Sequence, residues 1–150
     1  MIRLWLRILP LLLLIACCIL MLEESPILTE PVIEGLGLPL GTLIAWVGIT
    51  MFPFSILIGI RLIRKPISVV YRFYHRAFIL LTLLATPWGL VSYLLAGNWA
   101  ITFSNSDGFR GSEQAFSVFL YYTAFVISLT LLFIIIFAMH HLIINQKNKR

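Results

Sequence analysis

Long apolar runs separated by short polar stretches dominate the chain. Four such runs, at about residues 4–22, 40–62, 73–96 and 115–144, contain no Asp, Glu or Lys. A helix needs about 20 apolar residues to cross a hydrocarbon core of about 30 Å. An α-helix also pairs its backbone N–H and C=O groups with one another, as a segment inside a bilayer must. The pattern therefore predicts an all-α fold, an integral membrane four-helix bundle that forms a single membrane domain over residues 1–150.

Composition supports a membrane protein. Hydrophobic residues make up 61% of the 150 residues and charged residues 11%, whereas soluble domains carry about 25% charge. The net charge of +5 would suit nucleic acid, but the cations flank apolar runs and form no soluble basic face. We therefore expect no nucleic-acid partner.

Basic and acidic residues lie in different segments between the apolar runs. Ten of the eleven basic residues lie at the two chain ends or in the central loop, namely Arg3, Arg7, Arg61, Arg64, Lys65, Arg72, Arg76, Lys147, Lys149 and Arg150. All six acids lie in the other two loops, as Glu23, Glu24, Glu30, Glu34, Asp107 and Glu113. Basic loops stay on the cytoplasmic side. We predict that both termini are cytoplasmic in a multi-pass protein of the bacterial cytoplasmic (inner) membrane.

Small residues recur at helical spacing in the second and third runs. They are Gly41, Ala45, Gly48, Ser55 and Gly59 in one run, and Thr82, Ala85, Gly89, Ser92 and Ala96 in the other. Such faces allow helix backbones to approach closely, so we predict an antiparallel hairpin in which the two faces meet. Pro53 and Pro87 are expected to bend or interrupt these helices, and Pro66 to begin the third helix.

The loops hold the candidate contacts with lipid and partners. In the central loop, Arg61, Arg64, Lys65, Arg72 and Arg76 are expected to meet headgroups, including anionic lipid. The segment 23–39 is expected to be irregular or extended, and Ser112 to cap the fourth helix. Arg110 is the one cation on the acidic face, which makes it a candidate external contact.

Few residues suggest chemistry. No metal-binding spacing, phosphate loop or dinucleotide fingerprint is present, and no carboxylate lies within a run, which counts against ion-coupled transport. His75, His140 and His141 share a cytoplasmic level, so two helices have the ligands for haem b. On a helical projection His75 and His141 lie at the edges of the small-residue faces, and His140 points the other way.

Two cysteines offer a further alternative. Leu14-Ile15-Ala16-Cys17 resembles the box that precedes the lipidated cysteine of bacterial lipoproteins. The apolar run continues beyond Cys18, however, and this favours an uncleaved span in which both cysteines are small apolar side chains.

These observations predict a non-enzymatic membrane protein that acts through protein or lipid interaction, as an accessory subunit, a regulator or a protective, immunity-type partner. No cofactor is expected under this hypothesis. A haem-b redox subunit that uses His75 with His140 or His141 is one alternative. A small-molecule or lipid-handling membrane protein that uses the bends at Pro53 and Pro87 is another.

Overall fold

Helices account for most of the chain. The structure, a computed structural model, describes residues 2–23, 26–33, 37–99 and 110–147. The helices are α1 (Ile2–Leu22), α2 (Leu40–Gly59), α3 (Arg61–Arg64), α4 (Val69–Ala85), α5 (Trp88–Ala96) and α6 (Glu113–Lys147). The prediction of a mostly helical, all-α chain is confirmed.

Three helical segments are long and apolar enough to cross a membrane. They are Leu40–Gly59, Val69–Ala96, which combines α4 and α5, and Glu113–Ile144. The apolar stretch described in α1, Ile8–Leu22, is shorter. Length and composition of the three segments therefore support a membrane protein, as the apolar runs predict.

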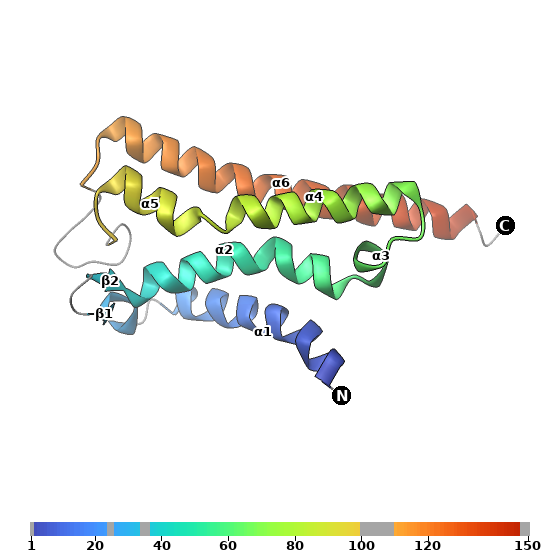
Figure 1. The fold of residues 1–150 in the computed structure, drawn as a ribbon, viewed down its shortest axis with the longest axis horizontal. Helices are drawn as coiled ribbons and strands as arrows, with labels where there is room; N and C mark the ends of the chain where they lie inside the picture. Colours follow the sequence, from blue (N-terminus) through green and yellow to red (C-terminus); the bar gives the residue numbers. More distant parts are fainter. Residues whose placement is uncertain (1, 24–25, 34–36, 100–109, 148–150) are drawn as a thin grey trace.

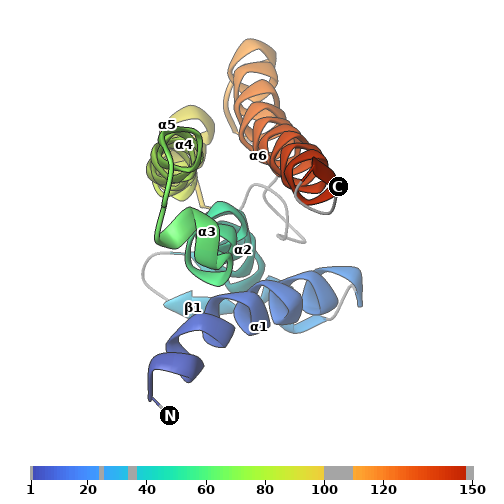
Figure 2. The same cartoon turned by 90° about the vertical axis from the view of Figure 1, so that its right-hand side faces the viewer.

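The helices lie lengthwise beside one another and pack in chain order. α1 packs on α2, α2 packs on α4 and α5, and α6 packs on α4 and α5. Figure 1 shows both chain termini at the same end as α3, with the β strands at the other end. Figure 2 shows the α4–α5 pair and α6 beside each other on one side of α2, with α1 on its other side. The basic segment α3 therefore shares one end with both termini.

Hydroxyl side chains set two helix starts. The Ser68 hydroxyl accepts a hydrogen bond from the Tyr71 N–H at 3.4 Å, and α4 begins at Val69. The expectation that Pro66 begins this helix is wrong, because Ser68 supplies the cap two residues later. Ser112 accepts a hydrogen bond from the Ala115 N–H at 3.2 Å, so it caps α6 as predicted.

The segment between α1 and α2 contains short regular elements. A 3-10 turn, η1 (Pro26–Thr29), precedes β1 (Pro31–Ile33), which pairs antiparallel with β2 (Leu38–Pro39). The extended conformation expected here is thus present, and it includes a strand pair that the prolines did not predict. Residues 100–109, between α5 and α6, lie outside the described residues.

The most enclosed packing lies between α4 and α6. Its buried residues are Ile63, Tyr71, Tyr74, Phe78, Leu81 and Phe137, and residues of α2 such as Ile56 and Leu57 pack against them. The buried side chains of α6 are Phe119, Val126, Thr130 and Phe137. Aromatic rings therefore supply much of the contact between these helices.

Candidate functional sites

The break between α4 and α5 is a polar site inside an apolar chain. Pro87 has no N–H, so the helix cannot continue its hydrogen bonds through this point. Three consecutive carbonyls before the break accept hydrogen bonds from other helices. The Trp46 Nε1–H donates to the Thr86 carbonyl at 2.6 Å, the Thr50 hydroxyl donates to the Ala85 carbonyl at 3.4 Å, and the Tyr122 hydroxyl donates to the Leu84 carbonyl.

Backbone polar groups inside a bilayer require internal partners, so α2 and α6 stabilise this interruption. Pro87 interrupts the helix as predicted. The three donors at this break, Trp46, Thr50 and Tyr122, were not predicted from the sequence. The sequence feature that could have identified them is a hydrogen-bond donor side chain on each neighbouring helix, at the same depth as Pro87. The three hydrogen bonds hold the helix break in place.

The small residues of α2 meet α1. An added Cβ at Gly48 would lie 3.3 Å from the Cβ of Cys17. Ala45 and Gly48 line a hollow together with residues of α1. Gly41 and Ser55 are buried, whereas Gly59 is exposed and an added Cβ there would meet nothing within 4 Å. The hairpin of α2 with α4 and α5 is present, but a different face of α2 forms it.

That face carries Trp46. An added Cβ at Gly89 would lie only 2.2 to 2.7 Å from atoms of the Trp46 indole. On α4 and α5 the other small residues Ala85, Ser92 and Ala96 are buried, and Thr82 is half-buried. A large aromatic residue on one helix therefore sits over a glycine on the other, in place of the two matching small faces that we expected.

The histidines lie in or beside the aromatic contact between α4 and α6. The His140 ring lies 5.9 Å from the ring of Tyr71 and 6.0 Å from that of Tyr74. His141 stacks on Phe137 at 6.0 Å, and its Nδ1 is 3.5 Å from the Tyr71 hydroxyl. His75 is half-buried on α4. His140 thus faces α4, contrary to the helical projection, because the inward face of α6 is bulky and not small.

The surroundings of these imidazoles bear on haem binding. The Nδ1 atoms of His75 and His140 are buried without a hydrogen-bond partner, which would suit a ligand. The rings of Tyr71 and Tyr74, however, fill the space on the α4 side of His140. Within the described residues, the hollow on α6 and the hollow between α1 and α2, both described below, are not lined by a histidine. Haem binding by His75 with His140 or His141 stays a prediction.

The basic residues of the central loop lie around α3. Arg61, Lys65, Arg72 and Arg76 are exposed, whereas Arg64 is half-buried. The Arg64 Nη1 donates a hydrogen bond to the Ile58 carbonyl at 2.8 Å, and this carbonyl lies in the last turn of α2. Arg64 therefore stabilises a helix end, and the other four cations are the ones open to the surroundings.

Two further candidates are placed by the structure. Arg110 is exposed just before the Ser112 cap of α6. Asp107, three residues before it, lies outside the described residues. Cys17 is buried inside α1 against Gly48. A cysteine held in mid-helix against another span fits a packing role in an uncleaved helix.

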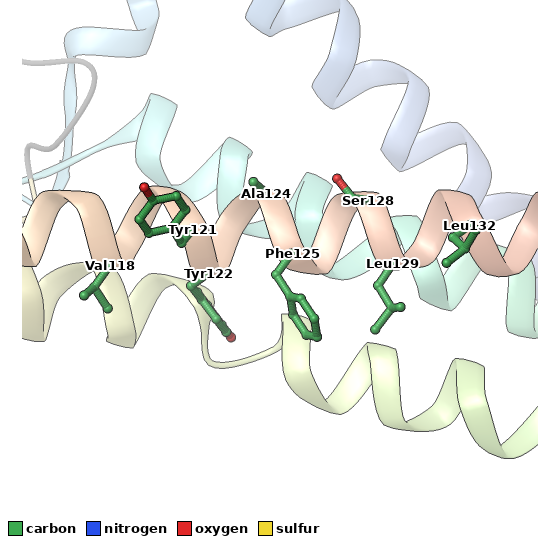
Figure 3. Close-up of a pocket in the computed structure, with 8 residues that line it drawn as sticks. All are labelled: Val118, Tyr121, Tyr122, Ala124, Phe125, Ser128, Leu129 and Leu132. Carbon is green, nitrogen blue, oxygen red and sulfur yellow. The ribbon is translucent and has the colours of Figure 1, made fainter.

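The exposed side of α6 carries a hollow of about 830 Å³. It is lined by Val118, Tyr121, Tyr122, Ala124, Phe125, Ser128, Leu129 and Leu132. In Figure 3, Ala124 and Ser128 project from one edge of the helix, and Phe125 and Leu129 project from the other. Ala124 and Ser128 are exposed, so the one pair of small residues on α6 is not used in packing against α4 and α5.

Metal chemistry and known families offer no further guide. Among residues 2–23, 26–33, 37–99 and 110–147, no group of three or more His, Cys, Asp or Glu side chains is close enough to hold a metal ion. Comparison with known proteins yields no matching family model, no matching curated protein and no matching solved structure. The site geometry is therefore the basis for a functional proposal.

Proposed function

We propose that this protein is a non-enzymatic, multi-pass protein of the bacterial cytoplasmic membrane that binds a transmembrane helix of another membrane protein, as an accessory subunit, regulator or protective partner. The observation that carries the proposal is the exposed small-residue pair on α6. Ala124 and Ser128 are four residues apart, and such pairs let a second helix backbone approach closely.

The surroundings of this pair support docking by a helix. Tyr121 is 76% exposed and Phe125 is 55% exposed, and both line the same hollow as Ala124. Large side chains beside a small notch offer a ridge and a groove to a neighbouring helix. Aromatic residues are also common among the residues that dominate interface energetics.

Substitution of Ala124 tests the docking surface. Ala124→Leu fills the notch, and a bulky residue at a close contact costs about 1–3 kcal/mol. We expect at least about a fivefold loss of affinity for the partner helix. Ala138→Leu is the matched control, because Ala138 is exposed on the same helix and does not line the hollow.

The measurement is native mass spectrometry of the protein purified in mild detergent from its own host. A stoichiometric membrane protein should accompany the wild type and Ala138→Leu, and should be depleted in Ala124→Leu. Equal recovery of that protein with both variants would contradict docking at this hollow. Recovery of no stoichiometric membrane protein with the wild type would contradict the proposed function itself.

The proposed topology has four spans, with α1 as the first, in a four-helix bundle with cytoplasmic termini. Its support is the charge sorting together with the shared position of α3 and both termini (Figure 1). Reporter fusions after Ile33 and Ser106 should be external, and those after Ser68 and Arg150 cytoplasmic. A single reporter on the opposite side would rule out this topology.

The exposed cations around α3 are proposed to bind anionic lipid. Each cation near the surface contributes about 1 kcal/mol of attraction, so Lys65→Gln with Arg72→Gln should remove about 2 kcal/mol. Arg64 is left in place because it binds the Ile58 carbonyl. We expect the double variant to retain less phosphatidylglycerol on purification, while Arg110→Gln, at the other end, retains the wild-type amount. Unchanged retention in the double variant would leave these cations with a role in insertion alone.

A further inference from the structure

A second hollow lies between α1, α2 and α6, on the opposite side of α2 from the α4–α5 pair. It has a volume of about 540 Å³ and an almost entirely apolar lining. The lining residues come from α1 (Leu14, Cys17, Cys18, Met21, Leu22), from α2 (Ile44, Ala45, Gly48, Ile49, Phe52) and, from α6, Ile127. We call this hollow the α1–α2 groove.

The length of the α1–α2 groove distinguishes between its candidate occupants. Its lining spans Leu14 to Leu22 on α1 and Ile44 to Phe52 on α2, which at 1.5 Å per residue is about 12 Å on each helix. A transmembrane helix occupies the full hydrocarbon thickness of about 30 Å. The groove covers most of one leaflet, about 15 Å, and so has the length of a lipid acyl chain.

Charge at the open end indicates the headgroup. Glu23 is exposed and directly follows Leu22, which lines the groove. Glu30 is also exposed, and its carbonyl accepts a hydrogen bond from the Leu40 N–H, one helical turn from Ile44. The basic residues of α3 lie at the opposite end of the molecule. The end of the groove near Glu23 therefore suits a headgroup that carries a cation.

We propose that the α1–α2 groove binds one acyl chain of a phospholipid of the external leaflet, and that Glu23 pairs with an ammonium group of its headgroup. The leaflet assignment rests on the topology proposed above. The groove itself is separate from the α6 hollow and from its protein partner. The lipid would hold α1 and α2 together at a place where direct packing leaves space.

Cys18 provides the test of chain binding. It lines the groove and is exposed, so Cys18→Phe fills the groove from its open side. Ala16→Phe is the matched control, since Ala16 is exposed on the same helix and does not line the groove. Purified protein is incubated with phosphatidylethanolamine in detergent and examined by native mass spectrometry. We expect one retained lipid in the wild type and in Ala16→Phe, and at least tenfold less in Cys18→Phe.

The headgroup is tested by Glu23→Gln. The wild type is expected to retain phosphatidylethanolamine about threefold better than phosphatidylcholine, whose quaternary ammonium has no N–H donor. Glu23→Gln should retain both lipids equally. Equal lipid retention by Cys18→Phe and Ala16→Phe would overturn the chain site. A threefold preference that persists in Glu23→Gln would overturn the pairing with Glu23.

A measurement on the wild type covers the case in which Cys18→Phe fails to fold. Alkylation by N-ethylmaleimide reports on Cys18, which is exposed, whereas Cys17 is buried. The alkylation rate should fall at least threefold when phosphatidylethanolamine is added. An unchanged alkylation rate would overturn the proposal. These lipid experiments use protein that has been purified without a partner. Failure to bind lipid would therefore leave the proposed docking of a partner helix at the α6 hollow unaffected. An external reporter found in the cytoplasm would overturn the leaflet assignment and leave the measured lipid retention valid.

Discussion

Replacement of Gly89 by leucine is expected to be the most destabilising single substitution among the helix contacts. Even a Cβ at this position would lie 2.2 to 2.7 Å from the Trp46 indole. The indole cannot move away freely, because its Nε1–H donates to the Thr86 carbonyl at 2.6 Å and its ring stacks on Trp99. Overpacking of this kind costs about 3 kcal/mol, and loss of the hydrogen bond to Thr86 adds to it.

Thermal unfolding in detergent measures this effect. Gly48→Leu should destabilise less, because an added Cβ there lies 3.3 Å from Cys17 and not inside another ring. Leu132→Phe should have little effect, since Leu132 is half exposed. Gly89→Leu combined with Trp46→Ala should be less destabilising than the two separate effects added together. Equal unfolding temperatures for Gly89→Leu and Leu132→Phe would contradict the close contact between α2 and α5.

Phe137→Ala is expected to separate α6 from α4 at the end near the termini. The Phe137 ring is buried and meets the Tyr74 ring edge-on at 5.3 Å, the Tyr71 ring at 6.1 Å and the stacked His141 ring at 6.0 Å. Truncation of a buried aromatic ring leaves a cavity and costs about 3 kcal/mol.

The neighbouring Ile136 provides the control. It is 44% exposed, so Ile136→Ala removes a similar apolar group from a position that few protein atoms surround. The midpoint of thermal unfolding should fall clearly for Phe137→Ala and hardly for Ile136→Ala. Equal midpoints would contradict the packing of α6 on α4 through this aromatic contact.

Local features of the sequence were sufficient for the long helices, but not for the strand pair β1–β2 or for the start of α4. Apolar length predicted the helices, because a chain in hydrocarbon must satisfy its backbone internally. Pro87 predicted the break before α5, since its missing N–H is a property of that one residue. Ser112 predicted the start of α6 for a similarly local reason: a hydroxyl before a helix binds an N–H of the first turn.

Which helix faces meet was decided only by the tertiary structure. The small residues around Gly48 predicted a close contact but did not specify its partner, because a small face accepts any neighbouring helix. Gly48 meets α1, and Trp46 fills the space over Gly89. On α6 the small pair Ala124 and Ser128 is exposed, and bulky Phe137 packs inward. Inside a bilayer both faces of a helix are apolar, so hydrophobicity does not distinguish inside from outside; shape complementarity between particular side chains does, and it exists only once the helices are placed together.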